Sequence, residues 1–166
     1  MQRCTGFEKA PQLFGSNRHS ARYIYRTLIT NFHRLNNKKI CLLVEDDIDD
    51  QELFMIALKS VQEKVTCIVA NNGVEALRQI AVEKELVPDI IFLDFNMPKM
   101  NGLECLEVMR KLPHLSGVKI FMHSTSENSD LVAKSSLMGA DGFLVKQADM
   151  NVFGETLRAI FKGEIS

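Results

Sequence analysis

The stretch Asp89-Ile90-Ile91-Phe92-Leu93-Asp94 is a continuous apolar run that ends in a carboxylate, and Phe95-Asn96-Met97-Pro98 follows it. An apolar run without polar alternation is typical of a strand that is covered on both faces. Its last residue, Asp94, then lies at the rim of a sheet, next to a turn. A second run, Ile40-Cys41-Leu42-Leu43-Val44, ends in Glu45-Asp46-Asp47. Two buried strands that end in carboxylates indicate a metal or phosphoryl site.

Strand-like and helical patterns alternate from about residue 39 onward. The strand-like runs cover residues 40–44, 65–70, 89–93, 118–122 and 142–145. Apolar residues at helical spacing cover residues 49–63, 72–81, 102–111, 128–138 and 150–162. This alternation predicts a parallel sheet with helices on both faces. We therefore expect residues 38–166 to form a doubly wound α/β domain with five helices and a five-stranded parallel sheet, in the flavodoxin-like order 2-1-3-4-5.

That strand order brings the polar strand ends together. Strands one and three are neighbours in it, so Asp46 and Asp94 are expected side by side beyond the carboxyl ends of the strands. Ser124 follows the fourth strand and Lys146 the fifth, which places both at the same edge. Crowded carboxylates raise one another's pKa unless a cation neutralises them, and Mg²⁺ is a hard ion that takes such oxygens. With the lysine as a second positive charge, the set suits phosphoryl transfer to an aspartate nucleophile.

Individual residues predict details of the helices. Asn72 is a suitable N-cap with Glu75 three residues on, as in a capping box. Gly139 is suited to the C′ position that ends a helix. Leu53 and Val152 fall in the apolar patterns of their helices and are expected to face the core.

Other residues near the strand ends have plainer interpretations. An acidic run after a strand is often the solvated start of a helix, which is what we expect of Asp49 and Asp50. His123 is expected to be structural or solvent-facing. The chain has no GxxxxGK or GxGxxG motif, so nucleotide binding has no support.

Composition narrows the class of protein. The chain has 166 residues, of which 46% are hydrophobic, as in a globular domain with a sizeable core. No apolar run approaches the roughly 20 residues of a membrane span. Cys41 and Cys67 lie in apolar runs and are expected to be buried thiols, and no Cys/His pair has metal-ligand spacing. We expect a reducing, cytoplasmic location.

The first 37 residues differ from the rest. Residues 1–39 carry eight Lys/Arg and one acid, a net charge of +7, and the remaining chain has 12 basic and 20 acidic residues, a net charge of −8. Three interpretations of residues 1–37 stay open: a disordered or poorly packed extension, attachment to nucleic acid or an anionic surface, and an organelle presequence. A basic amphipathic helix over about residues 18–34 is compatible with the pattern.

Five motifs, each at the end of a predicted strand, together resemble those of a known protein family. Residues about 39–162 resemble the receiver (REC) domain of two-component response regulators, the family of CheY-like proteins. The resemblance rests on Leu42-Leu43-Val44-Glu45-Asp46-Asp47, Phe92-Leu93-Asp94-Phe95-Asn96-Met97-Pro98, Asn101-Gly102, Ser124 and Gly139-Ala140-Asp141-Gly142-Phe143-Leu144-Val145-Lys146.

The resemblance implies an acceptor and a metal site. Asp94 would accept a phosphoryl group from a sensor histidine kinase or a histidine phosphotransfer protein. Asp46 and Asp94 would bind Mg²⁺, with Mn²⁺ as an alternative, and Glu45 would bind it through water. Asn96 would contribute its backbone carbonyl to the metal.

The resemblance also implies a switch. Lys146 would pair with the phosphoryl oxygens, Ser124 would hydrogen-bond the phosphoryl group, and the rotamer of Phe143 would follow the Ser124 loop. Three positions depart from the family: Gln147 replaces the usual proline after the lysine, Phe143 replaces a frequent tyrosine, and His123 replaces an apolar residue. A cis bond before a residue other than proline costs about 2.5–4 kcal/mol, so we expect a trans bond before Gln147.

We therefore expect a stand-alone receiver that switches a partner-binding face near strands four and five, rather than a turnover enzyme. Its downstream protein target, cognate kinase, phosphoryl lifetime and oligomeric state are not indicated by the sequence. One rival is a Mg²⁺-dependent phosphohydrolase with an aspartate nucleophile. Such enzymes commonly need a second aspartate two residues later, where this chain has Asn96. Another rival, a DNA-binding regulator that uses residues 1–37, is less favoured.

Overall fold

The computed structural model describes residues 38–61, 64–82, 87–126 and 128–165. The basic extension over residues 1–37, with the helix considered for residues 18–34, lies outside the described residues. The end predicted for the first helix, at residue 63, also lies outside them. Within the described ranges, no helix is both long enough and apolar enough to cross a membrane.

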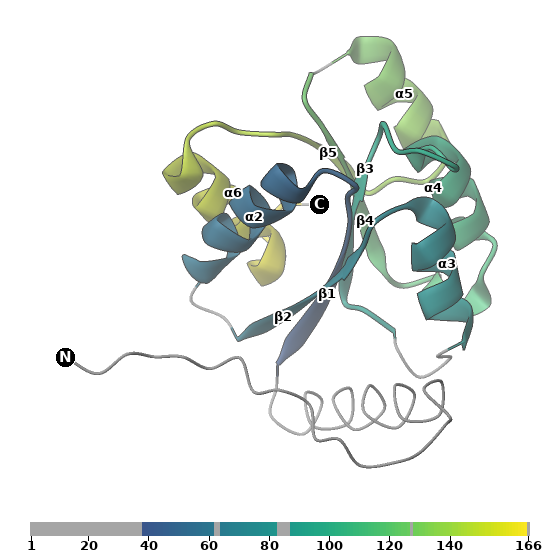
Figure 1. The fold of residues 1–166 in the computed structure, drawn as a ribbon, viewed down its shortest axis with the longest axis horizontal. Helices are drawn as coiled ribbons and strands as arrows, with labels where there is room; N and C mark the ends of the chain where they lie inside the picture. The colour runs from purple at the N-terminus through teal and green to yellow at the C-terminus, as the bar shows by residue number, and fades with distance from the viewer. Residues whose placement is uncertain (1–37, 62–63, 83–86, 127, 166) are drawn as a thin grey trace.

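Five parallel strands form one sheet with helices on both faces (Figure 1). The strands are β1 (Lys39–Val44), β2 (Val65–Ala70), β3 (Ile90–Asp94), β4 (Lys119–Ser124) and β5 (Gly142–Val145). The helices are α2 (Ile48–Lys59), α3 (Gly73–Val82), α4 (Gly102–Arg110), α5 (Ser129–Leu137) and α6 (Met150–Lys162), with a short 3₁₀ turn, η1 (Pro113–Leu115). The strand order β2-β1-β3-β4-β5 confirms the predicted flavodoxin-like topology.

The core has two parts because side chains of each strand alternate between the faces of the sheet. Ile91 and Leu93 of β3 belong to the cluster on the face covered by α3, α4 and α5. Ile90 and Phe92 belong to the cluster under α2 and α6. Phe92 also makes an edge contact with Phe54 of α2, with ring centroids 4.9 Å apart. Burial of each such phenyl ring contributes roughly 1.5–3 kcal/mol to folding.

Polar side chains begin most of the helices. The side chains of Asp47, Asn101, Asn128 and Asp149 accept hydrogen bonds from the first turns of α2, α4, α5 and α6. These caps satisfy backbone N–H groups that have no partner within the helix.

The predicted ends of two helices are confirmed with one correction. Asn72 accepts a hydrogen bond from the N–H of Glu75 at 3.0 Å, as predicted. The capping box, however, does not close on Asn72, because the Glu75 carboxylate accepts the N–H of Asn71 instead. Gly139 has φ of 95°, a left-handed conformation that suits glycine beyond the end of α5.

Leu53, Val152 and Cys67 are less buried than predicted. Leu53 is 40% exposed and Val152 is 49% exposed. The buried stripes of α2 and α6 run instead through Phe54, Ala57, Leu58, Phe153, Leu157, Ile160 and Phe161. Each mispredicted residue precedes a buried phenylalanine, so it lies about 100° away from the core-facing direction. Cys67, expected to be buried, is half-buried because β2 is the edge strand.

Candidate functional site

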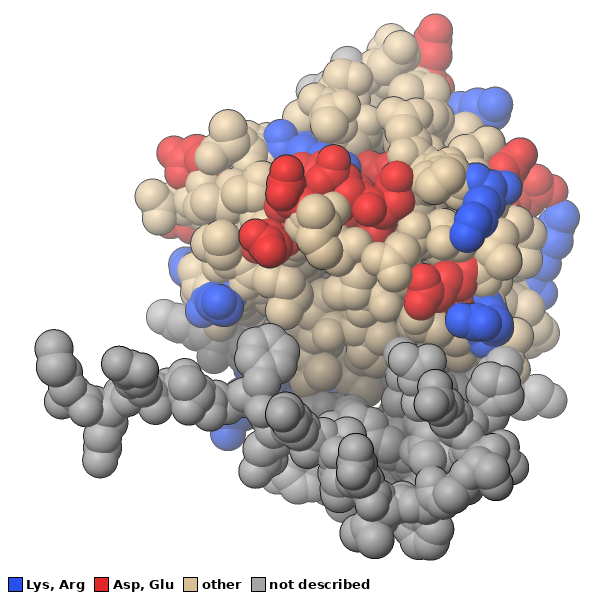
Figure 2. All heavy atoms as spheres, viewed as in Figure 1, with Lys and Arg blue, Asp and Glu red and all other residues tan. Residues whose placement is uncertain are grey.

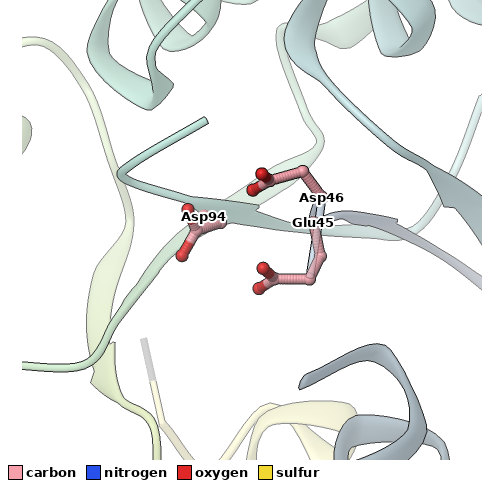
Figure 3. Close-up of side chains that lie close together, drawn as sticks. All are labelled: Glu45, Asp46 and Asp94. Carbon is pink, nitrogen blue, oxygen red and sulfur yellow. The ribbon is translucent and has the colours of Figure 1, made fainter. Parts of the chain in front are cut away.

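Three carboxylates meet where β1 and β3 end side by side (Figure 3). The pairing of Val44 with Leu93 aligns the two strand ends. One oxygen from each of Glu45, Asp46 and Asp94 lies within 4.8 Å of the others. Glu45 and Asp94 are only 1% and 4% exposed, whereas Asp46 is open to solvent. The sheet topology therefore places two buried acids and one exposed acid at a single point.

Lys146, the first residue after β5, reaches this cluster with its side chain. Its Nζ lies 2.7 Å from Glu45 Oε2 and 2.8 Å from Asp94 Oδ1. A third carboxylate oxygen, Asp50 Oδ2, lies 2.7 Å away. The backbone N–H of Lys146 donates to the carbonyl of Ser124 at 2.7 Å, which extends the β4–β5 pairing by one step. The backbone of Lys146 is therefore held by β4, and its ammonium group lies among three carboxylates.

Burial and pairing set the charge states of this cluster. Removal from water raises the pKa of Glu45 to about 7, the charge of Asp94 adds to this rise, and Lys146 opposes it. Burial alone would lower the pKa of Lys146, but its hydrogen bonds to Asp50, Asp94 and Glu45 outweigh burial and raise that pKa above its usual value. Lys146 is therefore charged at neutral pH, while Glu45 can carry a proton near pH 7.

The turn after β3 orients Asp94. The N–H of Asn96 donates to Asp94 Oδ2 at 2.7 Å. The N–H of Gly102 donates to the carbonyl of Phe95 at 3.0 Å, which closes the turn against the start of α4. Lys99 has φ of 70°, so the chain reverses there through the left-handed region. One oxygen of Asp94 thus binds the turn and the other faces Lys146.

The proposed switch residues lie on the two neighbouring strands. The fourth strand was predicted to end at residue 122, ahead of Ser124, but Ser124 is the last residue of β4 and is buried. Phe143 pairs with Met122 across the β4–β5 ladder and is partly buried. His123 is buried, so the structural interpretation holds and the solvent-facing one is wrong. All described peptide bonds, including the one before Gln147, are trans, as expected.

The start of α2 corrects the expectation of a solvated acidic run. Asp49 is exposed as expected, but Asp50 turns inward and forms an ion pair with Lys146. Asp47 accepts hydrogen bonds from the N–H groups of Asp49 and Asp50 and caps the helix. The available signal was position: Asp50 lies in the first helical turn after β1, so it begins at the same edge of the sheet as Glu45.

The three-carboxylate cluster fits a divalent cation. Hard cations such as Mg²⁺ and Mn²⁺ prefer carboxylate oxygens, and Glu45, Asp46 and Asp94 supply three of them. Figure 2 shows that acidic side chains gather on the surface above the carboxyl ends of β1 and β3. A single lysine does not neutralise this group. The donor set and the charge therefore both favour a bound cation.

Comparison with known proteins supports one family. Residues 41–158 match the response regulator receiver domain. The transcriptional regulatory protein LnrK of Bacillus subtilis (strain 168) is 30% identical over 125 residues, which cover 75% of this chain and 54% of LnrK. The response regulator Rcp1 of Synechocystis sp. is 30% identical over 119 residues, which cover 69% of this chain and 81% of Rcp1. This chain thus spans about half of LnrK and most of Rcp1.

Solved structures agree with this match. The Mn(2+)-bound form of Rcp1 superposes with a TM-score of 0.66 at 26% identity and covers 77% of this chain and 95% of its own. The phosphorylated cyanobacterial phytochrome response regulator RcpA superposes with a TM-score of 0.67 at 27% identity and covers 75% of this chain and 92% of its own. The sheet order, the matched residues and these neighbours agree, and the chain belongs to the family of response regulator receiver domains.

Proposed function

We propose that Asp94 accepts a phosphoryl group from a sensor histidine kinase or a histidine phosphotransfer protein, and that phosphorylation switches a partner-binding face. The observation that carries this proposal is the position of Lys146, whose Nζ lies 2.8 Å from Asp94 Oδ1 beside the Glu45–Asp46 pair. A carboxylate with one oxygen held by the backbone and the other facing a cation is oriented as a nucleophile. The phosphorus–nitrogen bond of the donor breaks as a phosphorus–oxygen bond to Asp94 forms.

We assign the cation as Mg²⁺, with Mn²⁺ as an alternative, held by Glu45, Asp46, Asp94 and the backbone carbonyl of Asn96. Support comes from the three carboxylates and from the Mn(2+)-bound form of Rcp1. When bound, the cation would neutralise charge on the phosphoryl oxygens. The surrounding residues keep Asp94 in place, because the Asn96 N–H holds its Oδ2.

Lys146 would pair with the phosphoryl oxygens once Asp94 is modified, and Ser124 would donate a hydrogen bond to the same group. Movement of the Ser124 loop would then change the packing of Phe143 on β5. Support comes from the place of Ser124 at the end of β4 and of Lys146 directly after β5, while Phe143 pairs with Met122 within the same two strands. A phosphorylated relative, RcpA, shares this fold. The output would be docking of a protein partner on the face near β4 and β5.

Labelling with acetyl phosphate tests this function. Wild-type protein should take up label in the presence of Mg²⁺, and the Asp94→Asn variant should not. Chelation of the metal should abolish labelling of the wild type. Label that survives in Asp94→Asn would remove Asp94 as the acceptor.

Turnover separates a receiver from a phosphohydrolase. Asn96 occupies the position where such hydrolases commonly carry a second aspartate, so we expect a lasting phospho-aspartate and no multiple turnover of phosphate esters. The chain would at most phosphorylate and dephosphorylate itself. A cytoplasmic location remains a prediction, with which the free thiols of Cys41, Cys67 and Cys105 agree.

The role of residues 1–37 is open to a separate test. Their net positive charge favours an anionic partner, although the described part of the chain does not include them. Salt-dependent DNA binding that is lost when residues 1–37 are deleted would support a DNA-binding regulator. Equal binding with and without them, or none in either form, would exclude it.

A further inference from the structure

Asp50 is a carboxylate of the site to which the proposed function gives no role. Its Oδ2 lies 2.7 Å from Lys146 Nζ, as close as any other oxygen around that ammonium. The side chain of Asp50 is 28% exposed and that of Lys146 is 13% exposed, so the pair is largely shielded from water. Shielded ion pairs are stronger and less sensitive to salt than those on the surface.

The ammonium of Lys146 is surrounded by carboxylate oxygens and donates a hydrogen bond to Asp50 Oδ2. It carries three N–H donors, and three carboxylate oxygens lie within 2.8 Å of it, from Glu45, Asp50 and Asp94. Glu45 and Asp94 also belong to the group of carboxylates that can hold a cation, and Asp50 does not. Asp50 is therefore a partner of Lys146 that cation binding leaves in place.

The first turn of α2 holds Asp50 where it is. The neighbouring Gln51 donates its side-chain N–H to the carbonyl of Glu45 at 2.8 Å and to Asn71 Oδ1 at 3.1 Å. Asp47 caps the same turn through the backbone N–H groups that follow it. Since these bonds fasten the start of α2 to the ends of β1 and β2, the backbone of Asp50 is held beside Lys146.

Resting on the proposed function, we propose that Asp50 is a positioning residue that competes with the phosphoryl group for Lys146 and so slows phosphorylation of Asp94. An incoming phosphoryl group needs an N–H of Lys146 as a hydrogen-bond donor. Part of that hydrogen bonding must then be withdrawn from the carboxylate of Asp50. The negative charge of Asp50 also opposes the approach of an anionic donor. Asp50 therefore favours the unmodified state of the receiver.

The test compares Asp50→Asn with Asp49→Asn. Both changes remove one acid from the first turn of α2, so they match in net charge and in their effect on the helix dipole. Only Asp50 contacts Lys146, while Asp49 is exposed. The initial rate of phosphorylation is measured against acetyl phosphate concentration at saturating Mg²⁺. At low acetyl phosphate concentration, Asp50→Asn should raise this rate roughly tenfold, which is the scale of one hydrogen bond to a charged group. Asp49→Asn should raise it by less than about twofold, because exposed charges are screened.

Two more variants and a second probe complete the test. Asp50→Glu keeps the negative charge near Lys146 and should restore a rate near that of wild type. Asp50→Ser, with a residue suited to a helix start, repeats the loss of charge if Asp50→Asn folds poorly. Trifluoroberyllate, a phosphoryl mimic that is not turned over, should bind Asp50→Asn more tightly than Asp49→Asn.

The results separate the two proposals. If the phosphorylation rate of Asp50→Asn equals that of Asp49→Asn, or is lower than that of wild type, Asp50 does not compete for Lys146. Labelling of wild type at Asp94 would still support the proposed function in that case. If wild type and Asp94→Asn are equally unlabelled, the proposed function itself fails and the role of Asp50 falls with it. A faster Asp50→Asn with wild-type behaviour of Asp50→Glu would support the inference.

Discussion

The imidazole of His123 stacks on the ring of Phe153, with ring centroids 5.4 Å apart and an angle of 19° between the planes. Phe54 approaches its edge at 6.0 Å. His123 is only 2% exposed, and within the described residues neither of its ring nitrogens has a hydrogen-bond partner. A histidine thus fills an aromatic position between β4 and the helices α2 and α6, directly before Ser124.

This burial makes the protein sensitive to acid. The pKa of His123 is lowered to about 3, mainly by burial, with the positive charge of Lys146 adding to the fall and the negative charge of Asp50 opposing it. The unfolded chain takes up this proton near pH 6.5, so the stabilisation is present above pH 6.5 and is lost as the pH falls toward 3. In His123→Leu this loss should be absent. Between pH 7.5 and 5, wild type should lose about 2 kcal/mol more than the variant.

Urea unfolding followed by circular dichroism at several pH values measures this difference. The comparison uses the slope against pH, because the change in volume at position 123 shifts both ends of the range equally. Parallel profiles for wild type and His123→Leu would mean that the imidazole becomes protonated within the folded protein.

Cation binding should depend on pH through Glu45. Its pKa is raised to about 7 by burial, with Asp94 adding to the rise, so a cation must displace a proton from the site below that pH. We expect Mg²⁺ affinity to fall as the pH drops from 8 to 6, by up to roughly tenfold per unit below pH 7. Calorimetry in buffers of different ionisation enthalpy would detect the released proton.

Glu45→Gln provides the control for this prediction. The variant cannot release a proton at this position, so its Mg²⁺ affinity should be weaker and nearly independent of pH over the same range. Equal proton release by wild type and Glu45→Gln would place the titrating group elsewhere in the site.

The sequence was sufficient for the parts of the site that depend on strand ends. Apolar runs identify the strands, and parallel topology then brings Asp46, Asp94 and Lys146 to one edge, whatever the details of packing. Asp50 could not be assigned in this way. Its role depends on which direction the first turn of α2 faces and on a lysine 96 residues away, and neither is encoded in a local pattern.

The burial errors have a similar cause. Leu53 and Val152 fit an apolar helix pattern, but the direction of the buried stripe was set by large rings, Phe54 and Phe153, that pack against the sheet. A pattern that includes neighbouring apolar residues does not fix the rotation of a helix to within one residue. His123 is a similar case in a strand. Its polarity suggested exposure to solvent, but alternation with Met122 turns its side chain toward Phe54 and Phe153.

A partly buried polar connection joins α4 to the starts of β4 and β5, and its loss should be costly. Arg110 donates to Asp141 Oδ2 at 2.5 Å and to the carbonyls of Gly139 and Val118. The same oxygen of Asp141 accepts the N–H of Ile120 at 2.8 Å. Asp141→Ala would leave a partly buried arginine and a strand N–H without this partner, so we expect a loss of about 1–3 kcal/mol in urea unfolding.

The exposed pair of Lys111 and Glu107, also on α4, serves as the comparison. Because both side chains are in solvent, Glu107→Gln should leave the unfolding curve unchanged within error. If Asp141→Ala and Glu107→Gln had equal effects, the connection at Asp141 would be a surface feature without structural weight.

The close approach of α4 to the end of β3 leaves no room for a Cβ at Gly102. A Cβ at this position would lie 2.3 Å from the carbonyl oxygen of Asp94 and 3.0 Å from Phe95 Cα, and backbone atoms cannot rotate away. Gly102→Ala should therefore displace the turn that orients Asp94, destabilise the fold by about 1–3 kcal/mol and slow labelling by acetyl phosphate. Gly117→Ala, where a Cβ meets nothing within 4 Å, should leave both unchanged. Helix propensity alone would predict that Gly102→Ala stabilises the protein, by up to about 1 kcal/mol. The sign of the change in the free energy of unfolding therefore decides whether contact with Asp94 or helix propensity governs this position.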